Sequence, residues 1–133
     1  MKYIVNIEKR SDGSFVAYNV SGRDTIIGTG MTVSEAKEDY FNSIRELKEL
    51  NAEKGYESSP EIDGTPEFKF DLVSLFNYYD FFNVSKLAKI IGISASLMRQ
   101  YKLGNTAISE KQLSKIEGGI NRLGQELATL RLL

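Results

Sequence analysis

The sequence predicts a fold of the α+β class, with a small antiparallel βββα(β) domain over residues 1–70 and an all-α domain over residues 71–133. Three short runs with alternating apolar residues, separated by turn-forming residues, precede residue 31. Apolar residues then recur every three or four positions, which is the helical period. A polar stretch over residues 53–66 contains both prolines, and we interpret it as a linker or long loop.

The first three strands are predicted at residues 2–9, 15–20 and 25–29. In the first, Tyr3, Val5 and Ile7 fall on one face of the strand. Asp-Gly at residues 12–13 indicates a hairpin, because glycine adopts a positive φ at little cost. Residues 67–70 also alternate, and they fit either a fourth strand of this sheet or an extended linker.

A helix is expected to cover the sheet, because three short strands alone have nothing to bury their apolar face against. Thr32 and Glu35 have the spacing of a capping box, and Gly55 is suited to end the helix. An apolar stripe runs between them, formed by Ala36, Tyr40, Ile44, Leu47 and Leu50.

The composition narrows the possible functions. The 133 residues carry a net charge of −1 and include neither cysteine nor histidine, which excludes disulfides, thiolate catalysis, cysteine zinc sites and histidine bases. No apolar run reaches the ~20 residues that a membrane span requires, and the first residues lack the apolar core of a signal peptide. We therefore expect a cytoplasmic protein that has no membrane contact and needs no cofactor.

Residues 71–82 are predicted to form the first helix of the second domain, with Asp71 as its cap. Its apolar residues are Leu72, Leu75, Phe76, Tyr79 and Phe81 or Phe82. We interpret this cluster as core packing, although base stacking and a small-molecule pocket are alternatives.

Residues 85–104 have the pattern of two helices joined by a tight turn. Leu87, Ala88 and Ile91 have helical spacing, Gly92 suits a left-handed turn, and Ser94 can cap a second helix. Met98 and Tyr101 give that helix a buried face. This run resembles the phage-repressor (Xre/Cro-like) helix-turn-helix family, which places its second helix in the DNA major groove. A helical hairpin used for packing or dimerisation is the alternative interpretation.

The N-terminal residues carry a second resemblance. MKYIVNIEKRSDGSFVAYNV, followed by Gly28-x-Gly30-x-Thr32-x-x-Glu35-Ala36, is similar to HicB-type antitoxins over residues 1–55. With the helix-turn-helix, nearly the whole chain matches one HicB architecture, although residues 24–27 replace the Pro-Gly-Cys that the family often carries. The resemblance implies a partial ribonuclease-H-like, toxin-binding domain over residues 1–70 and a DNA-binding and dimerisation domain over residues 71–133. It also implies two partners, a small basic HicA-like ribonuclease toxin and the operator DNA of its own operon.

Ten residues on or beside the helix pair are candidate DNA contacts. Gln100 suits adenine, Arg99 suits guanine or phosphate, and Ser96 suits either base type, while Ala95 or Leu97 could contact a thymine methyl. The candidate phosphate contacts are Ser85, Lys86, Lys102, Asn105 and Thr106.

A last helix is predicted after the Ser109–Gln112 capping box. Its apolar residues form a heptad-like seam, Leu113, Ile116, Ile120, Leu123, Leu127 and Leu130. Gly118-Gly119 is expected to kink or break this helix, at a cost of about 1 kcal/mol per glycine. We expect its C-terminal half to support a homodimer or a higher homo-oligomer.

Two other functions are alternatives to the antitoxin. One is a stand-alone transcription regulator whose N-terminal domain senses a ligand or only dimerises. The other is a metal-dependent nuclease, which would need converging acidic groups, whereas Glu8, Asp12, Asp24 and Glu35 are expected to be solvated or used in caps. We therefore expect no catalytic residue, no metal site and no enzyme activity. Residues 1–70 carry a charge of −4 and residues 71–133 a charge of +3, which fits DNA at one end and a basic partner at the other.

Overall fold

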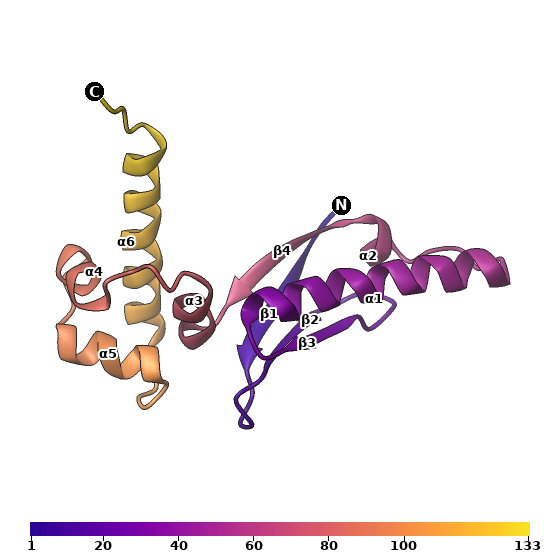
Figure 1. Ribbon diagram of the computed structural model, residues 1–133, viewed down its shortest axis with the longest axis horizontal. Helices are drawn as coiled ribbons and strands as arrows, with labels where there is room; N and C mark the ends of the chain where they lie inside the picture. The colour runs from indigo at the N-terminus through magenta and orange to yellow at the C-terminus, as the bar shows by residue number, and fades with distance from the viewer. The chain divides into compact units, whose positions relative to one another are not determined.

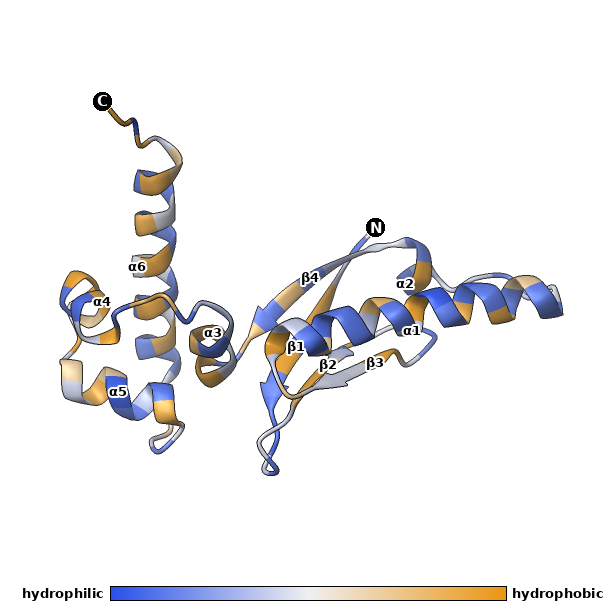
Figure 2. Ribbon diagram, viewed as in Figure 1, coloured by the Kyte–Doolittle hydropathy of each residue, from blue (hydrophilic) through white to orange (hydrophobic).

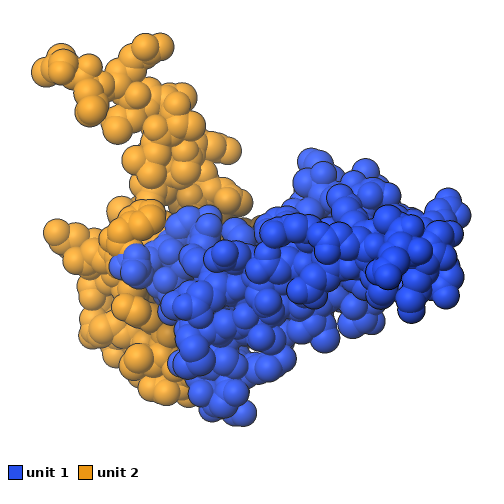
Figure 3. Space-filling model, turned by 45° about the vertical axis from the view of Figure 1, so that its right-hand side comes forward, with its two compact units in different colours: residues 1–80 blue, residues 81–133 orange.

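The computed structural model describes residues 1–133 and divides them into two compact units, unit 1 (residues 1–80) and unit 2 (residues 81–133) (Figure 1 and Figure 3). The chain is of the α+β class, with one four-stranded sheet and six helices. By this division, unit 1 carries nine basic and fifteen acidic residues, a charge of −6. Unit 2 carries eight basic and three acidic residues, a charge of +5.

The sheet of unit 1 is mixed. Its strands are β1 (Lys2–Lys9), β2 (Phe15–Asn19), β3 (Ile27–Gly30) and β4 (Thr65–Phe70), in the order β3-β2-β1-β4. β2 pairs antiparallel with both β1 and β3, but β4 pairs parallel with β1, so the prediction of an antiparallel sheet is wrong. The long helix between β3 and β4 returns the chain to the end of the sheet where β3 began, and parallel strands need such a crossover.

That helix, α1 (Val33–Lys54), begins and ends where its caps predict. The Thr32 hydroxyl accepts a hydrogen bond from the N–H of Glu35 at 3.1 Å. The Glu35 carboxylate in turn accepts one from the N–H of Met31 at 2.8 Å. Gly55 closes the last turn with a φ of 71°, in the left-handed region that glycine adopts without strain.

The core of unit 1 lies between α1 and one face of the sheet. Its buried side chains are Tyr3, Val5, Ile7, Phe15, Ala17, Ile26, Val33, Ala36, Tyr40, Ile44 and Ile62. The backbone of α1 approaches β3 closely, since a Cβ atom on Gly28 would lie 2.2 Å from the backbone nitrogen of Tyr40. Only glycine allows this approach. The core also holds one buried phenol pair, because the Tyr40 hydroxyl donates to that of Tyr3 at 3.1 Å.

The polar stretch before β4 is not a linker. It contains a single-turn helix, α2 (Pro60–Asp63), whose Glu61 and Ile62 are both only 2% exposed. Burial acts to raise the pKa of the Glu61 carboxyl. Hydrogen bonding to the carboxylate, to which the N–H of Arg23 donates, outweighs that effect, and the net pKa is lowered. The linker prediction failed because the N–H of Arg23, which donates to Glu61, lies almost forty residues away in the sequence.

Helix α3 (Leu72–Tyr78) is shorter than predicted and belongs to unit 1, because it contacts β1, α1 and β4. Asp71 caps it, accepting a hydrogen bond from the N–H of Ser74 at 2.7 Å. Tyr78 packs against the core of unit 1 and stacks on Phe70, with ring centroids 5.6 Å apart. The predicted aromatic cluster is therefore divided, since Phe81 lies beyond the helix and is 75% exposed.

Unit 2 consists of α4 (Val84–Ile91), α5 (Ala95–Leu103) and α6 (Glu110–Ala128). Its buried apolar residues are Val84, Leu87, Ala88, Ile91, Ile93, Met98, Tyr101 and Ile116. Along α6, hydrophobic and hydrophilic residues alternate up to its C-terminal end (Figure 2). None of the helices of the chain combines the length and the apolar composition that crossing a membrane requires.

Gly118-Gly119, which were predicted to kink or break α6, do not break it. The helix continues through Gly118 and Gly119, and the two glycines have different surroundings. A Cβ atom on Gly119 would lie 2.5 Å from Cγ1 of Ile91, whereas one on Gly118 would meet nothing within 4 Å. Gly119 therefore marks the point where α6 packs against α4, and this packing keeps the helix continuous.

Candidate nucleic-acid interface

The connection between α4 and α5 is three residues long, and several hydrogen bonds hold it. Gly92 has a φ of 90°, and the N–H groups of Gly92 and Ile93 both donate to the Ala88 carbonyl, at 2.8 and 2.9 Å. The Ser94 hydroxyl then accepts from the N–H of Leu97 at 3.1 Å and begins α5. These features agree with the sequence prediction, and the turn fixes the direction in which α5 leaves α4.

Two further contacts hold this corner. The side chain of Asn83 caps α4 by accepting a hydrogen bond from the N–H of Lys86 at 3.1 Å. From α6, the Lys115 ammonium group donates to the Gly92 carbonyl at 2.9 Å, where a positive charge also suits the C-terminal end of α4. Ile93 is buried beneath the turn. The corner is thus fixed from three elements rather than by the loop alone.

Helix α5 has one buried and one open face. Met98 is fully buried and Tyr101 nearly so, as predicted. Ser96 and Arg99 lie on the opposite, exposed side, and Gln100 and Lys102 border it. Of the predicted apolar contacts, Ala95 and Leu97 are half-buried, so less of their surface is open than the sequence prediction assumed.

Arg99 and Ser85 are brought together across the two helices. The Arg99 guanidinium donates to the Ser85 hydroxyl at 2.9 Å, and both residues are exposed. An exposed hydrogen bond of this kind contributes only about 1 kcal/mol, so a base or phosphate can replace it at little cost. The contact joins α5 to the first turn of α4.

Gln100 and Thr106 form a second pair. The Thr106 hydroxyl donates to Oε1 of Gln100 at 2.9 Å. This oxygen has a second lone pair, and the Gln100 amide nitrogen still has both of its hydrogens, so the side chain keeps the acceptor and the donor that adenine requires. Lys86, Lys102 and Asn105 are exposed around the same helix pair, and no side-chain contact holds them.

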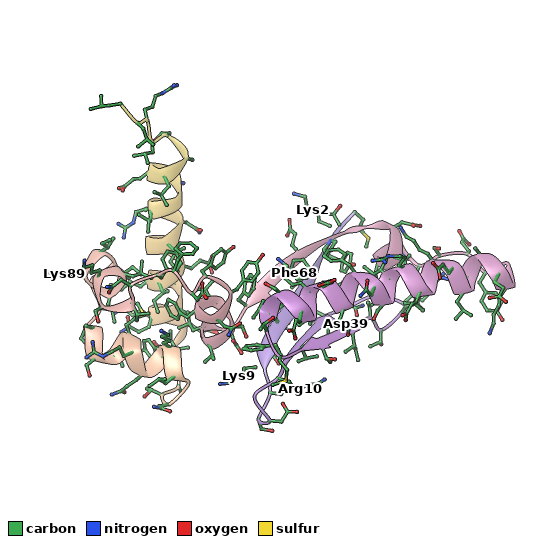
Figure 4. The ribbon with its side chains drawn as sticks, in the orientation of Figure 1. Lys2, Lys9, Arg10, Asp39, Phe68 and Lys89 are labelled. Carbon is green, nitrogen blue, oxygen red and sulfur yellow. The ribbon has the colours of Figure 1, made fainter.

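Two residues were missed in the sequence analysis. Lys89 is exposed on α4 and its side chain projects away from the helix (Figure 4). Leu103 is 66% exposed on α5, on the same side as Ser96 and Arg99. Helical spacing from Arg99 predicts the position of Leu103, whereas nothing local distinguishes Lys89 from an ordinary surface lysine.

The acidic residues of unit 1 were considered for metal binding. No group of three or more Asp and Glu side chains in the chain could hold a metal ion. Glu35 caps α1, Glu8 accepts a hydrogen bond from the Tyr18 hydroxyl at 3.0 Å, and Asp12 accepts from Ser14 within the hairpin. Hydrogen bonds from the Ser14 side chain and backbone lower the pKa of Asp12. Each carboxylate thus has a local structural partner.

A cavity of about 300 Å³ lies beside β3 in unit 1. It is lined by β3, the loop before it and the second half of α1, with Ser43 and Glu46 among its polar residues. This volume is at the lower limit for small-molecule sites.

The chain matches no protein-family model, no curated protein and no solved structure.

Proposed function

We propose that this chain binds DNA through α4 and α5, acting as a helix-turn-helix with α5 in the major groove. One observation carries the proposal: the tight turn at Gly92 leads into a helix that buries Met98 and Tyr101 and presents Ser96, Arg99 and Gln100 outward. A helix fixed by its neighbours, with exposed polar residues near its N-terminal end, is what base readout requires.

Charge supports the same conclusion. Unit 2 has a net charge of +5, although the whole chain has a charge of −1. Lys86, Lys89 and Lys102 are exposed on α4 and α5, so part of this positive charge lies on the helices that would meet DNA. Lysine and arginine contacts to phosphates supply most of the non-specific affinity for a duplex.

The test is binding of the full chain to a fluorescent duplex from the promoter of its own gene, measured by anisotropy. We expect Arg99→Ala/Gln100→Ala to weaken binding about a hundredfold, because each bidentate base contact contributes roughly 1–3 kcal/mol. Lys48→Ala, which removes an exposed lysine of α1, is the matched control and should bind like the wild type. Equal binding by the double variant and the wild type would show that this face does not read bases.

We further propose that the chain is a HicB-like antitoxin that neutralises a small basic ribonuclease toxin and represses its own operon. The −6 charge of unit 1 supports this partner, because an RNA-binding surface on a ribonuclease is basic and complementary charge favours its association. The resemblance of residues 1–55 and the opposite charges of the two units point to the same division of roles.

The antitoxin proposal is tested with the short reading frame beside this gene. Its product should be small and basic, should co-purify with the chain, and should lose ribonuclease activity when the chain is added in equimolar amount. Ribonuclease activity that is unchanged by the chain would contradict the toxin assignment and leave the DNA-binding proposal intact.

For operator binding we propose a homodimer formed through the C-terminal half of α6, since a single recognition helix gives little affinity and a dimer matches two half-sites. Leu127 is 57% exposed there and Leu130, just beyond the helix, is 64% exposed. Leu127→Glu should therefore reduce both self-association and promoter binding.

A stand-alone regulator that senses a ligand through unit 1 is the second candidate, and the cavity beside β3 is the observation that favours it. A small molecule that raises the unfolding temperature of the wild type but not of Ser43→Leu would support this function.

A further inference from the structure

The two edge strands of the sheet in unit 1, β3 and β4, differ in whether their outward backbone groups are hydrogen-bonded. At the β3 edge, side chains of α1 bond to one outward N–H group and one outward carbonyl. The N–H of Thr29 donates to the Asp39 carboxylate at 2.8 Å, and the Ser43 hydroxyl donates to the Ile27 carbonyl at 2.8 Å. Figure 4 shows Asp39 on the β3 side of α1. This edge therefore has no free donor and acceptor pair for another strand.

The β4 edge has no such cover. The N–H of Thr65 donates to Met1 and that of Asp71 to Ile7, so the odd-numbered residues of this segment pair with β1. The even-numbered residues, Pro66, Phe68 and Phe70, direct their backbone groups to the other side. The N–H groups of Phe68 and Phe70 make no hydrogen bond within the chain.

An aromatic strip lies along the open edge. Phe68 is half-buried between β4 and α1 (Figure 4), and its ring meets that of Phe41 edge-on at 5.8 Å. Phe41 is itself 43% exposed. Lys37 extends over the Phe68 ring, with its ammonium group 4.6 Å from the centroid. An unpaired strand edge beside partly exposed aromatic rings is typical of a surface that accepts a further strand.

We propose that the occupant of this edge is the β4 strand of a second copy of this chain, paired antiparallel about a two-fold axis at Phe68. The two sheets then form one continuous sheet across both copies. The outward groups of Phe68 hydrogen-bond to those of Phe68 of the partner subunit. This interface is separate from α4, α5 and α6, and it does not depend on DNA binding.

Charge complementarity within β4 favours a second copy over another partner. In the proposed register, Glu67 lies opposite Lys69 of the partner subunit, and the symmetry repeats this pair. Both residues are exposed on the face of the sheet that α1 does not cover. The pair is of the non-hydrogen-bonded kind, in which facing side chains are closest. Glu67 already holds one cation on this face, Lys2 at 3.5 Å.

Proline is compatible with this register. Pro66 lies opposite Phe70 of the partner subunit at the end of the ladder, so its missing N–H removes one hydrogen bond at each end. The bond from the N–H of Phe70 to the Pro66 carbonyl of the partner subunit remains. A proline at position 68 would be incompatible, because the N–H of that residue donates a hydrogen bond to the partner subunit at the two-fold axis.

Disulfide cross-linking of the full-length chain tests the register, and the wild type has no cysteine to interfere. We expect a mixture of Glu67→Cys and Lys69→Cys chains to form a cross-linked heterodimer under mild oxidation, because non-hydrogen-bonded partners lie within disulfide reach. Each variant alone should cross-link far less, and Lys48→Cys on α1 is the exposed control. Cross-linking of the mixture no greater than that of the control, or no greater than that of either variant alone, would overturn the proposal.

Charge exchange tests the affinity by sedimentation. Glu67→Lys alone and Lys69→Glu alone should each raise the dissociation constant of the β4 dimer about tenfold, because two attractive pairs become repulsive. Mixing the two variants, or combining them in one chain, should restore it. Equal self-association by all of these proteins, or a mixture that stays as weak as its components, would overturn the proposal.

Discussion

The two units differ in how far along the chain their contacts reach. In unit 1, Lys2 pairs with Thr65 across the sheet, and the N–H of Lys9 reaches the carboxylate of Asp71. In unit 2, α4 packs against α5 through a three-residue turn, and only α6 is brought back from further along the chain. The fold of unit 1 thus depends on contacts between residues that are distant in the sequence. Most of the candidate DNA-binding surface depends instead on the short turn between α4 and α5.

The two units are therefore sensitive to substitution at different kinds of contact. In unit 1, the backbone of α1 packs directly on β3 at Gly28. Because the neighbouring atoms there belong to the backbone, they cannot move aside as a side chain could. In unit 2, Gly119 of α6 packs against the side chain of Ile91, which can shift to some extent. Substitutions at these two glycines should therefore differ in severity, and hydrogen exchange can report the effect on each unit separately.

The largest effect is expected for Gly28→Ala. Its Cβ atom would meet the backbone of Tyr40 at 2.2 Å and that of Ala36 at 2.4 Å, so α1 would have to leave the sheet. We expect a loss of at least about 3 kcal/mol. Urea unfolding followed by circular dichroism measures it, with the exposed neighbour Thr29→Ala as the control. A stability equal to that of Thr29→Ala would show that the close approach of α1 is not required.

Adjacent glycines in α6 should respond with opposite signs. Gly119→Ala is expected to destabilise unit 2 by about 2 kcal/mol, because its Cβ atom would meet Ile91. Gly118→Ala is expected to stabilise it by about 1 kcal/mol, because its site is open and alanine favours the helix. Hydrogen exchange of α4 and α6 amides distinguishes the two variants. A gain in stability from Gly119→Ala would contradict the packing of α6 on α4.

Glu61→Gln should remove a pH-dependent part of the stability of unit 1. The folded-state pKa of Glu61 is lowered from 4.5, so its ionised form stabilises the fold at and above that pH. This contribution is lost as the pH falls through the lowered folded-state pKa.

We expect the variant to be about 1.5 kcal/mol less stable than the wild type at pH 7, since a charged acceptor is lost. The two proteins should converge on acidification, as measured by urea unfolding at pH 7 and pH 3. A difference that stays constant with pH would mean that Glu61 is not ionised in the folded state.

The smallest effect is expected for Lys86→Ala, which should act on unit 2 alone. A lysine that contacts a phosphate contributes through counterion release, so the slope of log affinity against log salt should fall by about 1 for any duplex sequence. Anisotropy titrations at several salt concentrations measure this slope. A loss of affinity that depends on the duplex sequence would instead assign Lys86 to base readout. Glu53→Ala in unit 1 is the control for non-specific effects of charge.

The elements that the sequence predicts well are those with a signal inside one helical turn. Thr32, Ser94 and Ser109 each cap the helix that follows, and Gly55, Gly92 and Gly104 each end one in the left-handed conformation. Capping side chains reach only two or three residues along the chain, so their effect is present in the sequence itself.

The predictions that were wrong depended on distant residues. The stretch before β4 was interpreted as a linker because its partners, the N–H groups around Arg23, lie in another loop. A kink or break of α6 was expected at Gly118-Gly119, because the sequence alone does not show that Ile91 packs against Gly119. The candidate DNA contacts were found by helical spacing, but the pairing of Arg99 with Ser85 required the two helices to be placed in space.

The α+β class, the caps of α1, α5 and α6 and the buried face of α5 follow from the sequence, because caps, glycine turns and apolar periodicity act over a few residues. The parallel pairing of β4 with β1, the burial of Glu61 and the place of α3 in unit 1 come from the packed fold. These outcomes are set by contacts between segments that are distant in the chain, and they depend on which backbones can approach closely enough to pack and hydrogen-bond.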